Sequence, residues 1–299
     1  MTNKRFTSPM ARLACLLAFL CLGIPMCAQK SEGEAIGAGG HKTRPYDFED
    51  DITPDPKKEK LVTNTQMFGF GATNILDTYL SPEKYKGGEI RYISHTLRDI
   101  PGNRWQQLII HQGYASFAED RSGDGSMMGA LYTLSFALQR PINLHDGRWQ
   151  FRVGGMTDFN IGVLDNPRNQ NNPAQMRLSA QVGPAASATY NFLLFGKTCN
   201  TRYEISIPVL GVMFSPNYGQ SYYEIFSRGD YDHNAVVTTP FNAPSMRHSL
   251  TFDFPLWGAT WRVGYLGDYQ QAEVNHLKQH TYTHALLLGW VKKIKIIED

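Results

Sequence analysis

Histidines are the residues of this chain best suited to acid–base chemistry, because an imidazole can take a proton from a neighbouring nucleophile. They stand beside serines or alone, at Ser94-His95, His111, His248-Ser249, His276, His280 and His284. Adjacent residues of a strand point to opposite faces, so a Ser-His neighbour pair would not form a nucleophile with its base. For this reason a membrane-embedded hydrolase or acyltransferase acting on envelope lipids is an alternative function and not the main prediction. Its candidate residues are His95, His233 and His280.

Two acidic stretches are the remaining candidates for chemistry. Asp230-Tyr231-Asp232-His233 combines carboxylates with an imidazole, as a protease at the rim of a barrel would require. Residues 120–125 offer oxygen atoms to calcium, but neither stretch has the ordered spacing of a calcium-binding loop. Asp, Asn and Gly are also ordinary turn residues, so we interpret both stretches as polar loops. We predict no metal, no cofactor and no catalytic residue.

The elements that must position these residues are strands with two different faces. In residues 149–163 the odd positions are mostly apolar and the even positions are mostly polar, and segments 178–194 and 250–256 repeat the pattern. Because successive side chains of a strand alternate between faces, each segment is predicted to be a ribbon with one apolar and one polar side.

The same criteria predict about ten strands. Their limits are 66–76, 89–98, 105–118, 127–138, 149–163, 178–195, 201–214, 246–256, 261–271 and 280–291. Several reach the roughly nine to eleven residues that cross a bilayer at a tilt, whereas strands of soluble proteins average about five or six. We therefore predict an all-β protein, an antiparallel transmembrane β-barrel of about ten strands. A soluble periplasmic β-sandwich is an alternative, and breaks at Pro184 and Pro208 would permit twelve strands.

Connection lengths and aromatic residues favour the barrel. Long connections (77–88, 164–177, 215–245) alternate with short ones (99–104, 196–200, 257–260), as external loops alternate with periplasmic turns in outer-membrane barrels. Aromatic residues that would form a girdle at headgroup level lie near predicted strand ends, at Trp105, Trp149, Tyr203, Trp257, Trp261 and Trp290.

The first residues have the layout of a cleavable export signal. Basic residues precede an apolar run, and Met26-Cys27-Ala28 precedes a polar stretch, so we predict a signal peptide at 1–28, with lipidation of Cys27 as an alternative. A mobile periplasmic segment at 29–64, the barrel at 65–293 and a tail at 294–299 follow. Cleavage leaves 26 basic and 27 acidic residues, a balance that gives no reason to expect nucleic acid, and leaves Cys199 as the single cysteine.

The polar faces would point into the lumen. They carry charges of both signs, at Glu89, Arg91, His95, Arg152, Asp158, Glu204, Asp253, Arg262 and Asp268. A barrel of this size has an interior that side chains largely fill, and open channels need about sixteen strands. We predict a lumenal charge network that plugs the barrel, with a narrow conduit as the alternative.

The longest loop is rich in aromatic residues. Its candidate residues are Tyr218, Tyr222, Tyr223, Phe226, Asp230, Tyr231, Asp232 and His233. We predict that it folds over the barrel mouth as a lid; alternatively it presents an adhesive surface to a glycan, a small molecule or a protein.

Two strings of the sequence resemble a known family. Leu76-Asp77-Thr78-Tyr79-Leu80-Ser81-Pro82 and the loop string Gly219-Gln220-Ser221-Tyr222-Tyr223-Glu224-Ile225-Phe226 are similar to an uncharacterised family of exported proteins from Bacteroidales. The resemblance implies an outer-membrane β-barrel that is a domain of unknown function, and it implies no activity. Together with the residues it predicts a non-enzymatic outer-membrane protein in contact with membrane lipid, serving a structural, binding or narrow-transport role.

Overall fold

The computed structural model describes residues 59–100, 104–145, 147–169 and 172–297. The predicted signal peptide and most of the predicted N-terminal segment lie outside these residues. The unit formed by Lys60–Ile296 is the barrel described here. The first strand begins at Glu59 and the last ends at Ile297.

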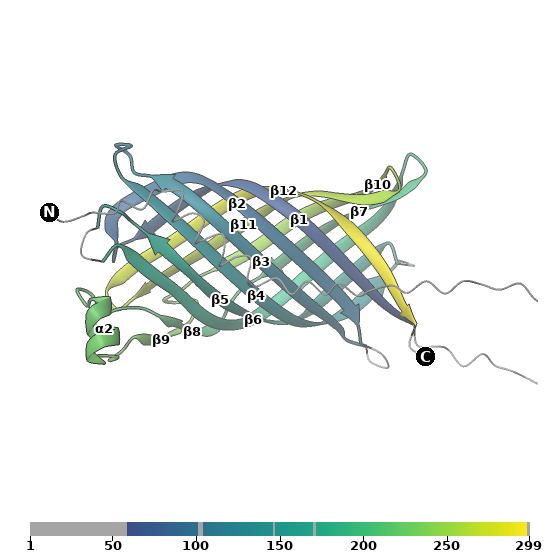
Figure 1. Ribbon diagram of the computed structural model, residues 1–299. Coiled ribbons are helices and arrows are strands. Elements are labelled where there is room, and N and C mark those ends of the chain that lie inside the picture. The colour runs from purple at the N-terminus through teal and green to yellow at the C-terminus, as the bar shows by residue number, and fades with distance from the viewer. Residues whose placement is uncertain (1–58, 101–103, 146, 170–171, 298–299) are drawn as a thin grey trace, which may run out of the picture. The chain divides into compact units, whose positions relative to one another are not determined.

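Ten antiparallel strands form a closed ring (Figure 1). They are β1 (Glu59–Asp77), β2 (Ser81–Asp99), β3 (Gln106–Glu119), β4 (Ser126–Leu144), β5 (Trp149–Asp165), β6 (Ala174–Leu194), β7 (Lys197–Ser206), β10 (Met246–Leu256), β11 (Ala259–Val274) and β12 (Leu277–Ile297). Each pairs with its neighbour in this order, β5 pairs with β6, and β12 lies beside β1. The predicted all-β barrel of about ten strands is confirmed.

The two ends of the barrel differ because one of them carries a long insertion between two strands. At the terminal end, where β1 begins and β12 ends, the strands are joined by connections 100–105, 145–148, 195–196 and 257–258. At the opposite end, which we call the helix end, the connections are 78–80, 120–125, 166–173, 207–245 and 275–276. The prediction of a long connection at 77–88 is wrong, because Ile75, Leu80 and Tyr85 pack in a buried apolar cluster that keeps β1 and β2 paired almost to their turn.

The insertion 207–245 carries β8 (Leu210–Phe214), α2 (Tyr222–Arg228) and β9 (Ala235–Thr238). The predicted strand 201–214 is wrong as one element: the chain leaves β7 before Pro208, which has no N–H to donate, and then forms β8. Pro184 lies in β6 where β6 changes its partner from β7 to β8. No helix among the described residues is long and apolar enough to cross a membrane.

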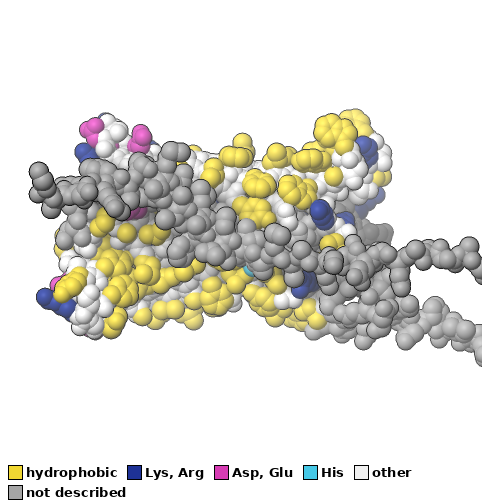
Figure 2. Space-filling model, viewed as in Figure 1, with side chains coloured by type: hydrophobic (Ala, Val, Ile, Leu, Met, Phe, Trp, Pro, Cys, Tyr) yellow, Lys and Arg dark blue, Asp and Glu magenta, His cyan; other side chains and the backbone are white. Residues whose placement is uncertain are grey.

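The wall has an apolar outside and a mixed inside. On β5 Phe159 and Ile161 are exposed, while Asp158 and Asn160, which alternate with them along the strand, are buried. Figure 2 shows hydrophobic side chains along the visible wall. Near the terminal end a run of aromatic ring contacts crosses the outer surface, through Trp149, Phe151, Tyr190, Phe192, Phe252 and Phe254.

Candidate functional site

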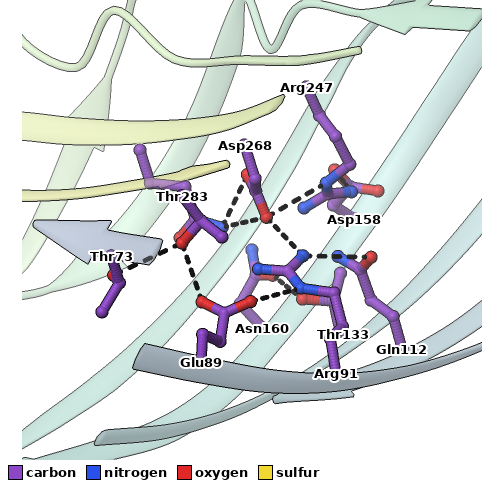
Figure 3. Close-up of polar contacts among 11 residues, drawn as sticks. Thr73, Glu89, Arg91, Gln112, Thr133, Asp158, Asn160, Arg247, Asp268 and Thr283 are labelled. Atoms are coloured by element: carbon purple, nitrogen blue, oxygen red, sulfur yellow. Dashed lines mark hydrogen bonds and ion pairs between the residues drawn. The ribbon is translucent and has the colours of Figure 1, made fainter. Parts of the chain in front are cut away.

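The candidate site is the lumen, which side chains fill in layers that alternate between polar and apolar. The central polar layer consists of Glu89, Arg91, Gln112, Asp158, Arg247, Asp268 and Thr283 (Figure 3). The terminal polar layer, nearer the terminal end, consists of His95, Gln106, Arg152, Arg202, Glu204, Asp253 and Arg262. Apolar side chains separate the two layers.

Arg91 holds the central polar layer together. Its Nε donates to Glu89 Oε1 and its Nη1 donates to Asp268 Oδ2, both at 2.7 Å, so one guanidinium joins carboxylates of β2 and β11 across the interior. The arginine side chain is almost completely buried, and its guanidinium lies 4.8 Å from the ring centre of Tyr114. Buried charges need such paired, hydrogen-bonded surroundings, because an unpaired charge in a dry interior is very costly.

Further strands join the same layer. Arg247 of β10 lies 3.5 Å from both Asp268 and Asp158, and the latter residue belongs to β5. Glu89 Oε2 accepts a hydrogen bond from the Thr283 hydroxyl of β12 at 2.7 Å. The layer therefore ties strands on several sides of the ring to one another, as Figure 3 shows.

The terminal polar layer is a second, separate network. Arg262 donates two hydrogen bonds to the carboxylate of Asp253, at 2.6 and 2.7 Å. Glu204 lies 2.7 Å from Arg202 and 3.3 Å from Nε2 of His95. Nearby, Arg152 Nε donates to Gln106 at 2.7 Å and also bonds to Gln150. The charged residues of this layer come from β2, β5, β7, β10 and β11.

A cavity of about 70 Å³ lies between the polar layers. Its apolar wall includes Met67, Ile93, Leu108, Met156 and Leu266. These residues belong to β1, β2, β3, β5 and β11, so the apolar layer extends around much of the ring.

A second cavity of about 80 Å³, here called the upper cavity, lies on the helix side of the central layer. The two cavities share no lining residue. On β11 the order along the strand is Leu266 at the first cavity, Asp268 in the central layer and Gln270 at the upper cavity. The central layer thus lies between them.

The helix end has its own cross-lumen contact. Asp77 at the end of β1 lies 3.0 Å from Arg177 of β6, a strand on the far side of the ring, and Arg177 also bonds to Gln279 of β12. Asp77 is buried and lies next to the β1–β2 turn.

The aromatic insertion contacts the rim at separated points. Tyr79 in the β1–β2 turn donates to the Gln220 carbonyl at 3.0 Å, and Tyr222 donates to Gln175 of β6 at 3.0 Å. Asn275 in the β11–β12 turn donates to the Ser215 carbonyl at 3.1 Å. These contacts reach both sides of the mouth, and burial of the Tyr222 hydroxyl raises its pKa to about 12.

Other aromatic rings of the insertion face outward. Tyr218, Tyr223, Phe226 and Tyr231 are exposed, and so are the neighbouring polar residues Asp230, Asp232 and His233. Asp232 and His233 lie 2.8 Å apart but both are largely exposed, an arrangement typical of a surface pair.

All of the residues predicted to line the lumen lie inside the barrel, and they divide between the two polar layers. Glu89, Arg91, Asp158 and Asp268 belong to the central layer; His95, Arg152, Glu204, Asp253 and Arg262 belong to the terminal layer. Sequence reasoning missed Asp77, Arg177, Arg202 and Arg247. Strand parity was a sufficient signal for two of them, because Arg202 shares a face with Glu204 and Arg247 shares one with Asp253.

Three further histidines contact tyrosine hydroxyls or an amide. His111 contacts the Tyr132 hydroxyl at 2.7 Å, His284 contacts Tyr265 at 2.5 Å, and His280 lies 3.4 Å from the Asn74 amide. Among the residues that the structure describes, no group of three or more His, Cys, Asp or Glu residues is arranged to hold a metal ion.

Comparison with known proteins gives a family and weak structural similarities. The profile of a family described as protein of unknown function (DUF3316) matches residues 15–299. No curated protein sequence matches. The transport unit of the autotransporter AIDA-I from Escherichia coli is 8% identical with a TM-score of 0.39, covering 81% of this chain and 93% of that one.

Two further solved structures show comparable values. Neisserial surface protein A is 10% identical with a TM-score of 0.29, covering 76% of this chain and 96% of that one. An outer membrane channel from Pseudomonas putida F1 is 9% identical with a TM-score of 0.31, covering 85% of this chain and 100% of that one.

Proposed function

Because the chain belongs to the DUF3316 family, whose function is unknown, we propose a role from its geometry: an outer-membrane β-barrel that does not conduct, and that serves as a structural and binding element of the cell envelope. One observation carries the proposal. Two salt-bridged layers, around Arg91 and around Arg262, cross the lumen at different heights. A solute would have to break both sets of buried ion pairs to pass.

The outer wall supports the membrane location. A band of exposed Phe, Ile, Leu and Val residues surrounds a closed ring of strands that pair with their neighbours along most of their length, which is the arrangement that hydrocarbon favours. Membrane lipid is the first partner under this proposal. Export through a signal peptide cleaved after residue 28 and an origin in Bacteroidales stay predictions.

The helix end would then face outward. Both ends of the strand ring, at Glu59 and Ile297, lie at the opposite rim, which an even number of strands requires. The exposed aromatic residues of the insertion, Tyr218, Tyr223 and Phe226, would there be available to a glycan, a small molecule or a protein.

Conductance in planar bilayers tests the proposal. We expect the purified barrel to insert without steady ion conductance, because both polar layers stay paired. The matched variant replaces Arg91 and Arg262 by Ala, leaving the wall unchanged, and should show at least brief openings if it folds. Steady channels in the unmodified protein would instead support the narrow conduit.

A further inference from the structure

The wall of the barrel has one incomplete stretch near the helix end. β10 begins at Met246, which pairs with Tyr269, so β11 continues to Val274 without β10 beside it. On the other side, the upper part of β6 pairs with β8, and β8 pairs with β9, the last strand of that branch. No strand ladder joins β9 to β11 among the described residues.

Residues 239–245 close this incomplete stretch, and we call these residues the seam. The Glu273 backbone N–H donates to the Asn242 carbonyl at 2.7 Å, and the Ser245 hydroxyl bonds to backbone atoms of Gln271 at 3.3 and 3.4 Å. Elsewhere in the ring, as between β4 and β5, the strands are joined by a continuous ladder. The seam is therefore held by fewer backbone hydrogen bonds than such a ladder.

The upper cavity lies directly behind the seam. Its lining includes Ala243 and Ser245 of the seam and Ala272 of β11. It continues inward to Ile75 and Leu164 on other strands. The seam thus separates this cavity from the outside of the wall.

The outside of the wall beside the seam is apolar. Val237 of β9 is 60% exposed and Phe241 of the seam is 97% exposed, and Leu210 and Val212 of β8 are also exposed. Under the proposed membrane location these side chains contact acyl chains, so a molecule that enters through the seam comes from the lipid phase.

The cavity lining indicates what that molecule would be. Leu131, Leu164 and Met213 offer contacts to an alkyl chain, while Arg177 and Gln279 offer donors to a polar head. Arg177 forms an ion pair with Asp77 at 3.0 Å, and its side chain keeps 20% exposure. This combination of one cation and an apolar wall suits a single alkyl chain with a carboxylate head.

We propose that the seam is a lateral entrance through which the upper cavity takes a single-chain carboxylate amphiphile from the membrane, with its head at Arg177. The site rests on the proposed membrane location but goes beyond it. The head and first carbons occupy the cavity, and the remaining chain lies in the seam.

Binding of a fluorescent fatty acid, 11-(dansylamino)undecanoic acid, to the barrel in nanodiscs tests the proposal. We expect saturable binding with a blue-shifted emission, at least tenfold weaker in Ala272→Phe, which fills the cavity. Ala188→Phe is the matched control, since it adds the same side chain to the outer wall of β6, away from the seam, and should bind as the unmodified protein does.

A second comparison tests the head. The methyl ester of the probe should bind more weakly to the unmodified protein, and the double variant Asp77→Asn with Arg177→Gln, which leaves no unpaired charge, should lose this preference. Absence of saturable binding, or equal binding by the unmodified protein and both Phe variants, would overturn the lateral entrance. Incorporation into nanodiscs, together with the absence of conductance when the same preparation is added to planar bilayers, keeps failure of this site distinct from failure of the barrel's proposed role.

Discussion

At the scale of single residues, Arg91 shows how the lumen is stabilised. Its guanidinium is shared by Glu89 and Asp268, and all three side chains are almost fully buried. Such a buried ionic group adds little net stability compared with apolar residues of the same size. Removing one partner, however, leaves the remaining charges buried without compensation. Arg91 therefore contributes more to fixing which strands meet across the lumen than to the free energy of folding.

Replacement of Arg91 by Met should lower the free energy of unfolding by about 3–5 kcal/mol, because it leaves the buried carboxylate of Glu89 without a cation and leaves Asp268 with the more distant Arg247 alone. Urea unfolding in detergent micelles, followed by tryptophan fluorescence, measures the change. Arg168→Ala is the control, since Arg168 is exposed and pairs only with Asp120 at 3.3 Å, and its effect should stay below about 1 kcal/mol. The triple variant Glu89→Gln, Arg91→Met, Asp268→Asn should recover part of the lost free energy of unfolding. If it is less stable than Arg91→Met, the explanation by uncompensated buried charge fails.

At the scale of elements, α2 is a short helix fixed by its ends. The Ser221 side chain accepts from the Glu224 backbone N–H, the Glu224 carboxylate accepts from the Ser221 backbone N–H, and Gly229 ends the helix in the left-handed region with φ 74°. Hydrogen bonds from the Ser221 backbone and hydroxyl hold the pKa of Glu224 below its ordinary value of 4.5. The cap, rather than a large core, gives this element its shape.

The depressed pKa of Glu224 predicts a pH response of the insertion. Its contribution to local stability is fully present above the ordinary pKa and is lost as pH falls through the lower folded-state value. Hydrogen exchange of the α2 amides, corrected for intrinsic rates, should therefore accelerate below about pH 4. Glu224→Gln keeps an acceptor at the cap but does not titrate, so its protection should stay flat over this range; an equal acid response in both proteins would contradict the assignment.

The sequence predicted most of the ring, and its misses have physical reasons. Strands β3 and β12 have ambiguous faces because Leu108, Ile110 and Leu287 point into an apolar layer inside the lumen, which a rule of polar inside and apolar outside does not anticipate. The break at Pro208 followed from its missing donor. The helix in the loop was missed although the spacing of Ser221 and Glu224 is a capping-box signal.

The contacts across the lumen were beyond the reach of strand parity. Parity assigns residues to the inner face, but it does not say that Asp77 meets Arg177 or that Arg91 meets Asp268, because these pairs depend on the height at which each strand is registered. The register follows from the ring as a whole.

At the scale of the whole molecule, an apolar wall surrounds a charged interior. Trp149 and Trp261 lie on this wall near the terminal end, where amphipathic rings settle at the level of lipid headgroups. The arrangement requires acyl chains around the wall.

Lipids brominated along their acyl chains test this arrangement. In vesicles of such lipids the tryptophan fluorescence of the folded barrel should fall well below that in unbrominated vesicles, because Trp149 and Trp261 lie against lipid. Phe replacements at these two positions should lower the quenching, and the remainder should come from the other tryptophans, such as Trp290, which contacts the exposed Phe68. A mature chain that stays folded and monomeric in buffer without detergent, with unquenched tryptophans, would favour the soluble sandwich instead.

The pairing of β1 with β12 also governs the order in which the strands assemble into the barrel. Hairpins such as β4–β5 need only nearby residues, whereas the contact that completes the circle joins the earliest and latest segments of the barrel. The ring therefore cannot close until the last strand is present. A chain truncated before residue 277 would expose two unpaired sheet edges that could associate with other chains.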